Sequence, residues 1–173
     1  RALAPEERAT IRGHAEAMVG LAETMVEVFH ERILDAERYR ELLAAPEGTL
    51  ATYYMGLVDD EGAPSFHGGD VRVVAPDGSE LFRLDGAGAL ARIAERTEPW
   101  TYVKFPYLRE PGWAGFAPGV DSGIYRVGPL ARLNVALRMA TPRAQAEYER
   151  YLAHFGRRPV HATFAYHWAR LIE

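Results

Sequence analysis

The sequence predicts an α+β protein, mainly a helical bundle with a small antiparallel β-meander inserted at about residues 50–84. Apolar residues recur at helical spacing in both terminal thirds, whereas the segment between them alternates apolar and polar residues. Of the 173 residues, 48% are hydrophobic, which is enough for the core of one domain. A charged fraction of 25% and a net charge of −4 argue against disorder and against nucleic-acid binding.

Residues 1–45 are expected to be helical. Pro5 suits a first helical position, and Glu6 and Glu7 place negative charge in the first turn, where the helix dipole favours it. One apolar face follows at spacings of three, four or seven: Ile11, Met18, Leu21, Met25, Val28 and Phe29. A second helix is expected from about Asp35 to the turn at Pro46.

The hydrophobic period then changes to that of strands. The runs "TLATYYMGLV", "DVRVV" and "SELFRL" are rich in β-branched and aromatic residues or alternate, and the turn sequences "DDEG" and "APDG" lie beside them. These runs predict a three-stranded meander over about residues 50–84.

The remaining segments are expected to be a helix at 86–98, an ordered aromatic loop at 99–128, and helices over 129–173. The loop is rich in proline and glycine but also in aromatic residues, which bury large areas when ordered. The last helices are expected near 129–138, at 142–155, and from 161 to the end. Thr141 before Pro142 predicts an N-cap, and Gly156 predicts a C-cap.

The residues themselves predict no catalytic, cofactor-binding or metal site. The chain has no cysteine, which excludes disulfides and thiolate-bound metals within it. No two of its six histidines are three or four residues apart, as a zinc pair on one helix would be. The sequence "HGGD" at 67–70 reads as a hairpin turn in preference to a metal or phosphate site.

The two ends and the lack of membrane signals predict where the chain belongs. It starts on Arg1 without methionine, and its last helix has no stop signal, so we expect the middle piece of a longer polypeptide. No apolar run reaches about 18 residues and no signal peptide is visible, which predicts a cytoplasmic protein without contact to a membrane.

Four stretches, "PWTYVKFPYL", "YRVGPLARLNV", "TPRAQAEY" and "PVHATFAYHWARLIE", together resemble the large (alpha) subunit of nickel–iron hydrogenases, in the cytoplasmic bidirectional type that couples to NAD(P). The resemblance implies an enzyme that reversibly oxidises H2 at a nickel–iron centre held by four cysteines. Those cysteines belong to R-x-C-G-x-C and D-P-C-x-x-C motifs, and neither motif occurs here. The resemblance therefore implies a central scaffold fragment that binds no metal and is inactive alone.

The resemblance also implies partners: a hydrogenase small subunit with iron–sulfur clusters, and a flavin module that passes electrons to NAD(P). NAD, NADP and deazaflavin remain open as electron acceptors. Two alternatives stay open for the chain itself. It could be a non-catalytic hydrogenase-like interaction or assembly module without a metal site, or a small-ligand binding domain built on the aromatic loop.

Six residues are candidates for contacts around the buried metal centre or with another subunit. The physical argument is strongest for the two arginines among them, because a buried guanidinium needs carboxylate or carbonyl partners. Both arginines flank the Gly-Pro boundary in "YRVGPLARLNV". The competing interpretation is that the arginines hold the loop to its own helices and the histidines are hydrogen-bonded core residues. The candidates are Lys104, Tyr107, Arg126, Arg132, His161 and His167.

Overall fold

The computed structural model describes residues 2–173 and confirms the α+β class. The chain forms two compact units, one ending at Ala44 and the other spanning Ala45–Glu173, and each is described by itself. No helix among the described residues is both long and apolar enough to cross a membrane.

The first unit is entirely helical. Helix α1 (Pro5–Phe29) runs into a π-helical turn at His30–Leu34, and α2 (Glu37–Ala44) follows. The start of α1 has the expected chemistry: Pro5 is its first residue, and the Glu7 carboxylate accepts a hydrogen bond of 2.7 Å from the Ala4 backbone N–H. This bond satisfies one of the N–H groups left free at a helix start.

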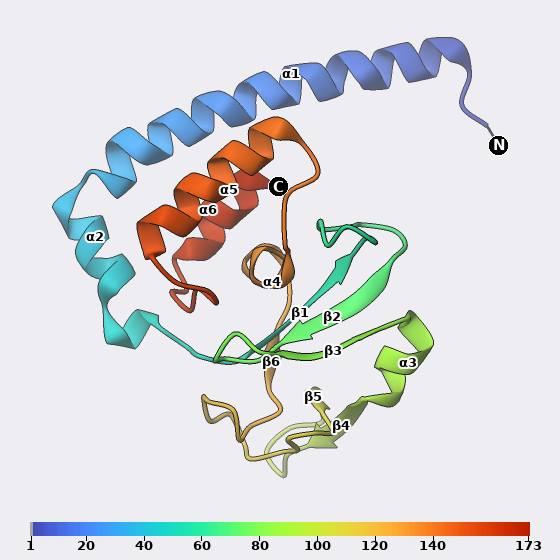
Figure 1. Ribbon diagram of the computed structural model, residues 1–173, viewed down its shortest axis with the longest axis vertical. Helices are drawn as coiled ribbons and strands as arrows, with labels where there is room; N and C mark the ends of the chain where they lie inside the picture. Colours follow the sequence, from blue (N-terminus) through green and yellow to red (C-terminus); the bar gives the residue numbers. More distant parts are fainter. Residues whose placement is uncertain (1) are drawn as a thin grey trace. The chain divides into compact units, whose positions relative to one another are not determined.

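The second unit is organised around a four-stranded sheet in the order β3-β2-β1-β6 (Figure 1). Strands β1 (Tyr53–Val58), β2 (Asp70–Val74) and β3 (Glu80–Leu84) form the predicted antiparallel meander. The short strand β6 (Tyr125–Arg126) adds to the free edge of β1 in parallel, with Tyr53 opposite Tyr125. The expectation of an irregular loop over 99–128 is therefore wrong at β6, because a partner 72 residues earlier in the chain extends it. It is also wrong at Lys104–Leu108, which forms a strand.

The helix expected at 86–98 is also wrong over its second half. Helix α3 covers only Gly86–Ala91, and Ile93–Thr97 forms strand β4, which pairs antiparallel with β5 (Lys104–Leu108). β-Branched Ile93 and Thr97 lie at the two ends of β4 and suit a strand. The deciding factor is the partner: β5 supplies a cross-strand neighbour for every residue of β4.

Three helices complete the second unit: α4 (Pro129–Val135), α5 (Pro142–Phe155) and α6 (Ala165–Ile172). Thr141 caps α5 by accepting a hydrogen bond from the Ala144 N–H, and Gly156 follows its last turn, as predicted. The last helix starts at 165 instead of 161, because Ala162 forms a β-bridge with Thr49. Figure 1 shows α4 between the sheet and the pair formed by α5 and α6.

Candidate functional site

Helix α4 is the most buried element of the second unit, with six of its seven residues buried. Gly128, at a φ of +84°, lies two residues after β6 and turns the chain into Pro129 at the first helical position. The helix crosses β1 at Gly56, where an added Cβ would lie 2.7 Å from Val135 Cγ2 and 3.3 Å from Arg132 Cγ. A glycine at this position of the strand therefore allows α4 to approach the sheet closely.

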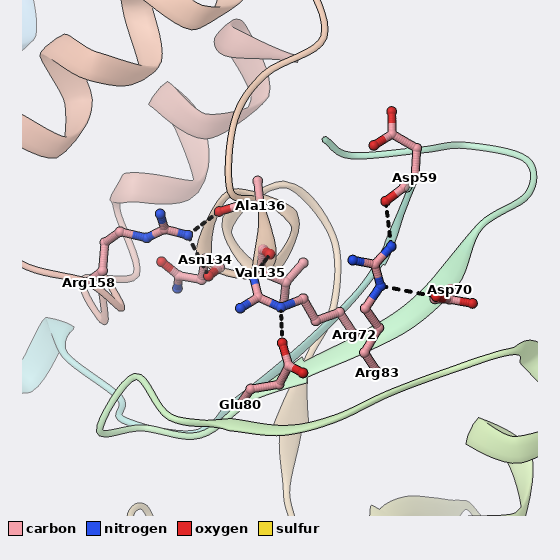
Figure 2. A network of polar contacts seen from close by, with 9 residues as sticks. All are labelled: Asp59, Asp70, Arg72, Glu80, Arg83, Asn134, Val135, Ala136 and Arg158. Atoms are coloured by element: carbon pink, nitrogen blue, oxygen red, sulfur yellow. Dashed lines mark hydrogen bonds and ion pairs between the residues drawn. The ribbon is translucent and has the colours of Figure 1, made fainter. Parts of the chain in front are cut away.

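The carbonyl end of α4 is capped by three side chains, which come from β2, from α5 and from the segment after α5. Figure 2 shows the two that are arginines. Arg72 of β2 donates to the carbonyl of Val135, and Arg158 donates to those of Asn134 (3.3 Å) and Ala136. The Tyr148 hydroxyl, from α5, lies 2.9 Å from the Leu133 carbonyl oxygen and 3.3 Å from that of Ala136. Two cations at this end match the negative pole of the helix dipole and satisfy carbonyls that lack partners within the helix.

Both guanidinium groups at this end are themselves held in place. Arg72 is 12% exposed, and its Nε donates to a Glu80 carboxylate oxygen at 2.6 Å. The Arg158 guanidinium lies 5.7 Å from the centre of the Tyr148 ring, within the range of a cation–π contact. The polar network thus joins α4 to the sheet and to the segment after α5.

Asn134 is the uncharged polar residue of α4, and it is 3% exposed. Its side-chain amide donates to the Val160 carbonyl and accepts from the Val160 N–H, both at 2.9 Å. The amide therefore satisfies both backbone groups of Val160, as a neighbouring strand would. This pair fixes α4 against the segment between α5 and α6.

A second arginine on the sheet, Arg83, orders the turn after β1. Its Nε lies 3.0 Å from Asp70 Oδ2, and its Nη2 donates to the Asp59 carbonyl at 2.8 Å (Figure 2). The Asp59 carboxylate accepts the N–H groups of Glu61 (3.0 Å) and Ala63 (2.9 Å). Asp59 thus has a structural role in the backbone of this turn.

Arg132 lies inside α4 and pairs with Glu173, the last residue. Its Nε and Nη2 donate to the two carboxylate oxygens at 2.5 Å each, and the Glu173 side chain is only 8% exposed. The bond to Glu173 raises the pKa of Arg132, against a smaller lowering by burial. The guanidinium also lies 5.1 Å from the centre of the Phe66 ring. This bidentate pair joins α4 to α6.

Arg126 and His161 are brought together on the other side of the Gly-Pro boundary. Arg126 donates to the His161 carbonyl and to the Thr163 hydroxyl, both at 3.2 Å, and its guanidinium lies 5.9 Å from the Tyr166 ring centre. Arg126 and Arg132 thus both contact the 161–173 segment, which is how the structure satisfies the two charges around Gly128.

The His161 ring stacks on Tyr54 with 5.8 Å between ring centres, and its Nδ1 lies 2.6 Å from the Tyr54 hydroxyl. Burial raises the pKa of Tyr54 to about 12, so the phenol keeps its proton. Burial, together with the charges of Arg157 and Arg126, lowers the pKa of His161. A neutral imidazole can accept the phenol proton at Nδ1, so the pair favours the uncharged histidine.

The other three candidates lie apart from this cluster. Lys104 Nζ is 2.7 Å from a Glu95 carboxylate oxygen on the β4–β5 hairpin, and both side chains are more than half exposed. Tyr107 packs on Trp113 with 5.5 Å between ring centres. His167 is exposed on α6, with its ring 6.5 Å from that of Phe164. No contact described for the chain joins these three residues to one another.

Sequence reasoning missed the residues that seat α4, namely Arg72, Arg158, Tyr148 and Gly56. One signal was available: Asn134 interrupts the apolar run "ARLNVAL", where a polar residue of low helix propensity indicates a specific buried partner. The arginines carried no such signal, because their partners are backbone carbonyls 63 and 22–24 residues away.

No protein-family model matches the sequence. Among curated proteins, the chain is 40% identical over 168 residues to an iron-sulfur subunit of the F420-non-reducing hydrogenase of Archaeoglobus profundus, and the match covers 97% of this chain and 34% of the relative. It is 37% identical over 171 residues to a vhu subunit of the F420-non-reducing hydrogenase of Methanocaldococcus jannaschii, and this match covers 99% of this chain and 38% of the relative. It is 36% identical over 119 residues to the beta subunit of the NAD-reducing hydrogenase HoxS of Cupriavidus necator, and this match covers 69% of this chain and 23% of the relative.

The fold matches a crystal structure of an NAD+-reducing NiFe hydrogenase in the H2-reduced state, with a TM-score of 0.81 and 30% identity. The match covers 99% of this chain and 36% of that one. The similarity therefore extends over nearly the whole chain and includes the arrangement of its elements. It also spans only about a third of the length of the first curated relatives.

These findings correct the type of subunit predicted from the sequence. The prediction of a large (alpha) subunit is wrong, because the relatives bear the names of an iron-sulfur subunit and of the HoxS beta subunit. The broader expectation of a hydrogenase-related oxidoreductase component is supported by every relative named above and by the matching structure. The chain is a homologue of hydrogenase subunits, over a stretch about a third of their length.

Proposed function

We propose that the chain supplies a cysteine-free scaffold to a hydrogenase complex that reversibly oxidises H2 to protons and electrons. The observation that carries this proposal is the joint match in sequence and fold: 40% identity over 97% of the chain to one hydrogenase component, and a TM-score of 0.81 over 99% of it to another. The buried and multiply anchored α4 is the part of the chain suited to be that scaffold.

The residues present do not fit a nickel–iron centre or an iron–sulfur cluster. Such centres need thiolate ligands, and the sequence contains no cysteine. Within residues 2–173 the structure also gathers no group of three or more metal-binding side chains. We propose that any such centre in the complex is held by residues other than these, so that the chain alone has no hydrogenase activity.

NAD(P) is the electron acceptor that we propose for the complex, with electrons passing through iron–sulfur clusters and a flavin in partner subunits in the cytoplasm. The C. necator relative and the matching structure are both named NAD-reducing, which supports this choice. Other relatives are named F420-non-reducing. Exposed Lys104 and His167, with Tyr107, are proposed contacts to another subunit, whereas Arg126, Arg132 and His161 are proposed to position α4.

A non-catalytic assembly module is the second candidate, and the complete lack of cysteine favours it. Such a module would bind hydrogenase subunits without being required for turnover. The two functions make opposite predictions for a variant that disturbs α4 inside an assembled complex.

Affinity purification of the tagged protein from its own host without oxygen tests the proposal. We expect hydrogenase subunits to co-purify, with H2-dependent reduction of benzyl viologen and NAD+, and with nickel and iron in the complex. The Asn134→Leu variant leaves both backbone groups of Val160 unpaired and should lower activity per complex. Arg170→Ala, at an exposed position of α6, is the matched control and should not change it.

Two results would count against the scaffold role. A tagged protein that carries neither hydrogenase subunits nor activity would remove the hydrogenase assignment. Full activity per complex in Asn134→Leu, with the same subunits bound, would favour the assembly module.

A further inference from the structure

The segment between α5 and α6 joins several elements of the second unit through backbone contacts on both sides of His161. The His161 carbonyl accepts a hydrogen bond of 3.3 Å from the Leu50 N–H, and Ala162 forms the β-bridge with Thr49. The Val160 N–H donates to a side chain of α4 at 2.9 Å. These contacts hold the segment against α4 and against the residues that lead into β1.

The ring of His161 adds a contact to β1 through Tyr54, and this contact requires an uncharged imidazole. The Tyr54 hydroxyl lies 2.6 Å from Nδ1 of His161, and burial raises the pKa of Tyr54 to about 12. The phenol therefore keeps its proton and donates it to Nδ1. Because Nδ1 can accept only while it carries no proton itself, protonation of His161 removes this hydrogen bond in its present direction.

The charges around His161 also oppose its protonation. Burial and the positive charges of Arg157, from the same segment, and of Arg126, from β6, lower the pKa of His161. The Pro76 carbonyl, from the turn between β2 and β3, acts in the opposite direction and offsets only part of this effect. Neither arginine is paired with a carboxylate in the described part of the chain. A protonated His161 would thus be a third cation in a cluster without an acid to balance it.

We propose that His161 is a pH-sensitive switch: uptake of a proton by its imidazole raises the population of a locally open state, in which residues 159–164 leave β1 and α4 while the rest of the second unit stays folded. In the open state the ring is in water and away from both arginines, so it binds a proton with its ordinary pKa of 6.5. Acid therefore favours the open state. The switch goes beyond the proposed hydrogenase role and does not depend on it.

Hydrogen–deuterium exchange of the 173-residue chain at pH 8 and pH 5 tests the switch, with rates corrected for the intrinsic pH dependence of amide exchange. The reporters are the N–H groups of Leu50, Val160 and Thr163, which all donate across the contact. Because pH 5 is about 1.5 pH units below the ordinary pKa, their opening constant should rise by up to about 30-fold. Amides of the β4–β5 hairpin should keep their protection, which distinguishes local opening from global unfolding.

Two variants connect the response to this ring and to its charged neighbours. His161→Asn keeps an acceptor close to the position of Nδ1 but does not titrate, so acid should not raise the exchange of the reporters. Arg157→Gln removes the charge of an exposed side chain that acts on the ring. The closed state then accepts a proton more readily, and the rise in acid should be smaller. Arg170→Gln, exposed on α6, is the matched control and should respond as the natural chain does.

Three results would overturn the switch. The first is unchanged protection of the three reporters between pH 8 and pH 5. The second is an equal rise in His161→Asn, which would assign the response to another group. The third is a rise that the β4–β5 amides share, which would show global unfolding in place of local opening. None of these results bears on co-purification with hydrogenase subunits, so the two proposals fail separately.

Discussion

Tyr148 and Tyr151 give the sharpest test of how α4 is seated. Both lie on α5, both are at most 1% exposed, and their rings are 6.4 Å apart. The Tyr148 hydroxyl donates at the carbonyl end of α4, whereas the Tyr151 hydroxyl has no hydrogen-bond partner among the described residues. Phenylalanine removes only the hydroxyl from each, so the two variants differ in hydrogen bonding and not in ring packing.

The magnitudes follow from these partners. Tyr148→Phe loses the bond to Leu133 and leaves a buried carbonyl unpaired, which should lower the free energy of unfolding by about 1–2 kcal/mol. Tyr151→Phe removes a hydroxyl whose burial without a partner is itself unfavourable by about 1–3 kcal/mol. It should therefore leave the free energy of unfolding unchanged or raise it by about 1 kcal/mol. The two variants should therefore differ by about 1–3 kcal/mol.

Urea denaturation followed by tryptophan fluorescence measures both values, because all three tryptophans lie in the second unit and Trp168 is 5.3 Å from Tyr151 between ring centres. Equal destabilisation by the two substitutions would refute the assignment of different hydrogen-bonding states. A stabilised Tyr148→Phe would refute the role of its hydroxyl as a cap of α4.

Three further substitutions test the environment of α4 and of the histidine near it. Gly56→Ala places a methyl group 2.7 Å from a Val135 side-chain carbon and should lower the free energy of unfolding by about 1–3 kcal/mol in urea titrations. Arg158→Met removes a cation from the carbonyl end of α4 and should cost about 1–2 kcal/mol in the same assay. The pKa of folded His161 lies below the ordinary 6.5, so the unfolded chain binds more protons than the folded chain in acid. The stability of the protein should therefore fall as the pH drops below 6.5. His161→Gln should flatten that part of the pH profile of the melting temperature.

Each of these has its own control. Gly13→Ala, at an open position in α1, should not destabilise the protein as Gly56→Ala does. Arg158→Lys keeps the charge but not the planar fork, so a stability between those of the natural chain and Arg158→Met is expected. His167→Gln, at an exposed position, should leave the acid part of the pH profile in place. An unchanged profile in His161→Gln would show that other groups cause the acid sensitivity.

Local chemistry made several elements predictable. Alternation placed the three strands of the meander, and Thr141 with Gly156 bounded α5, because caps and side-chain periods act within a few residues. The helical period that predicted α1 is likewise a pattern of neighbouring turns. The lack of cysteine, also a property of composition, already excluded a thiolate-bound metal on this chain.

Contacts between distant residues decided the rest. Whether residues 93–97 continue a helix or form a strand depended on β5, and β6 exists because the edge of β1 was open. The arginines singled out from the sequence, Arg126 and Arg132, do bind near the start of α4. The cations at its other end, Arg72 and Arg158, come from elements far along the chain. Sequence determined which residues could form a helix, a turn or a cap, whereas tertiary structure decided which carbonyls and carboxylates each buried charge would meet, because those partners become neighbours only after the chain has folded.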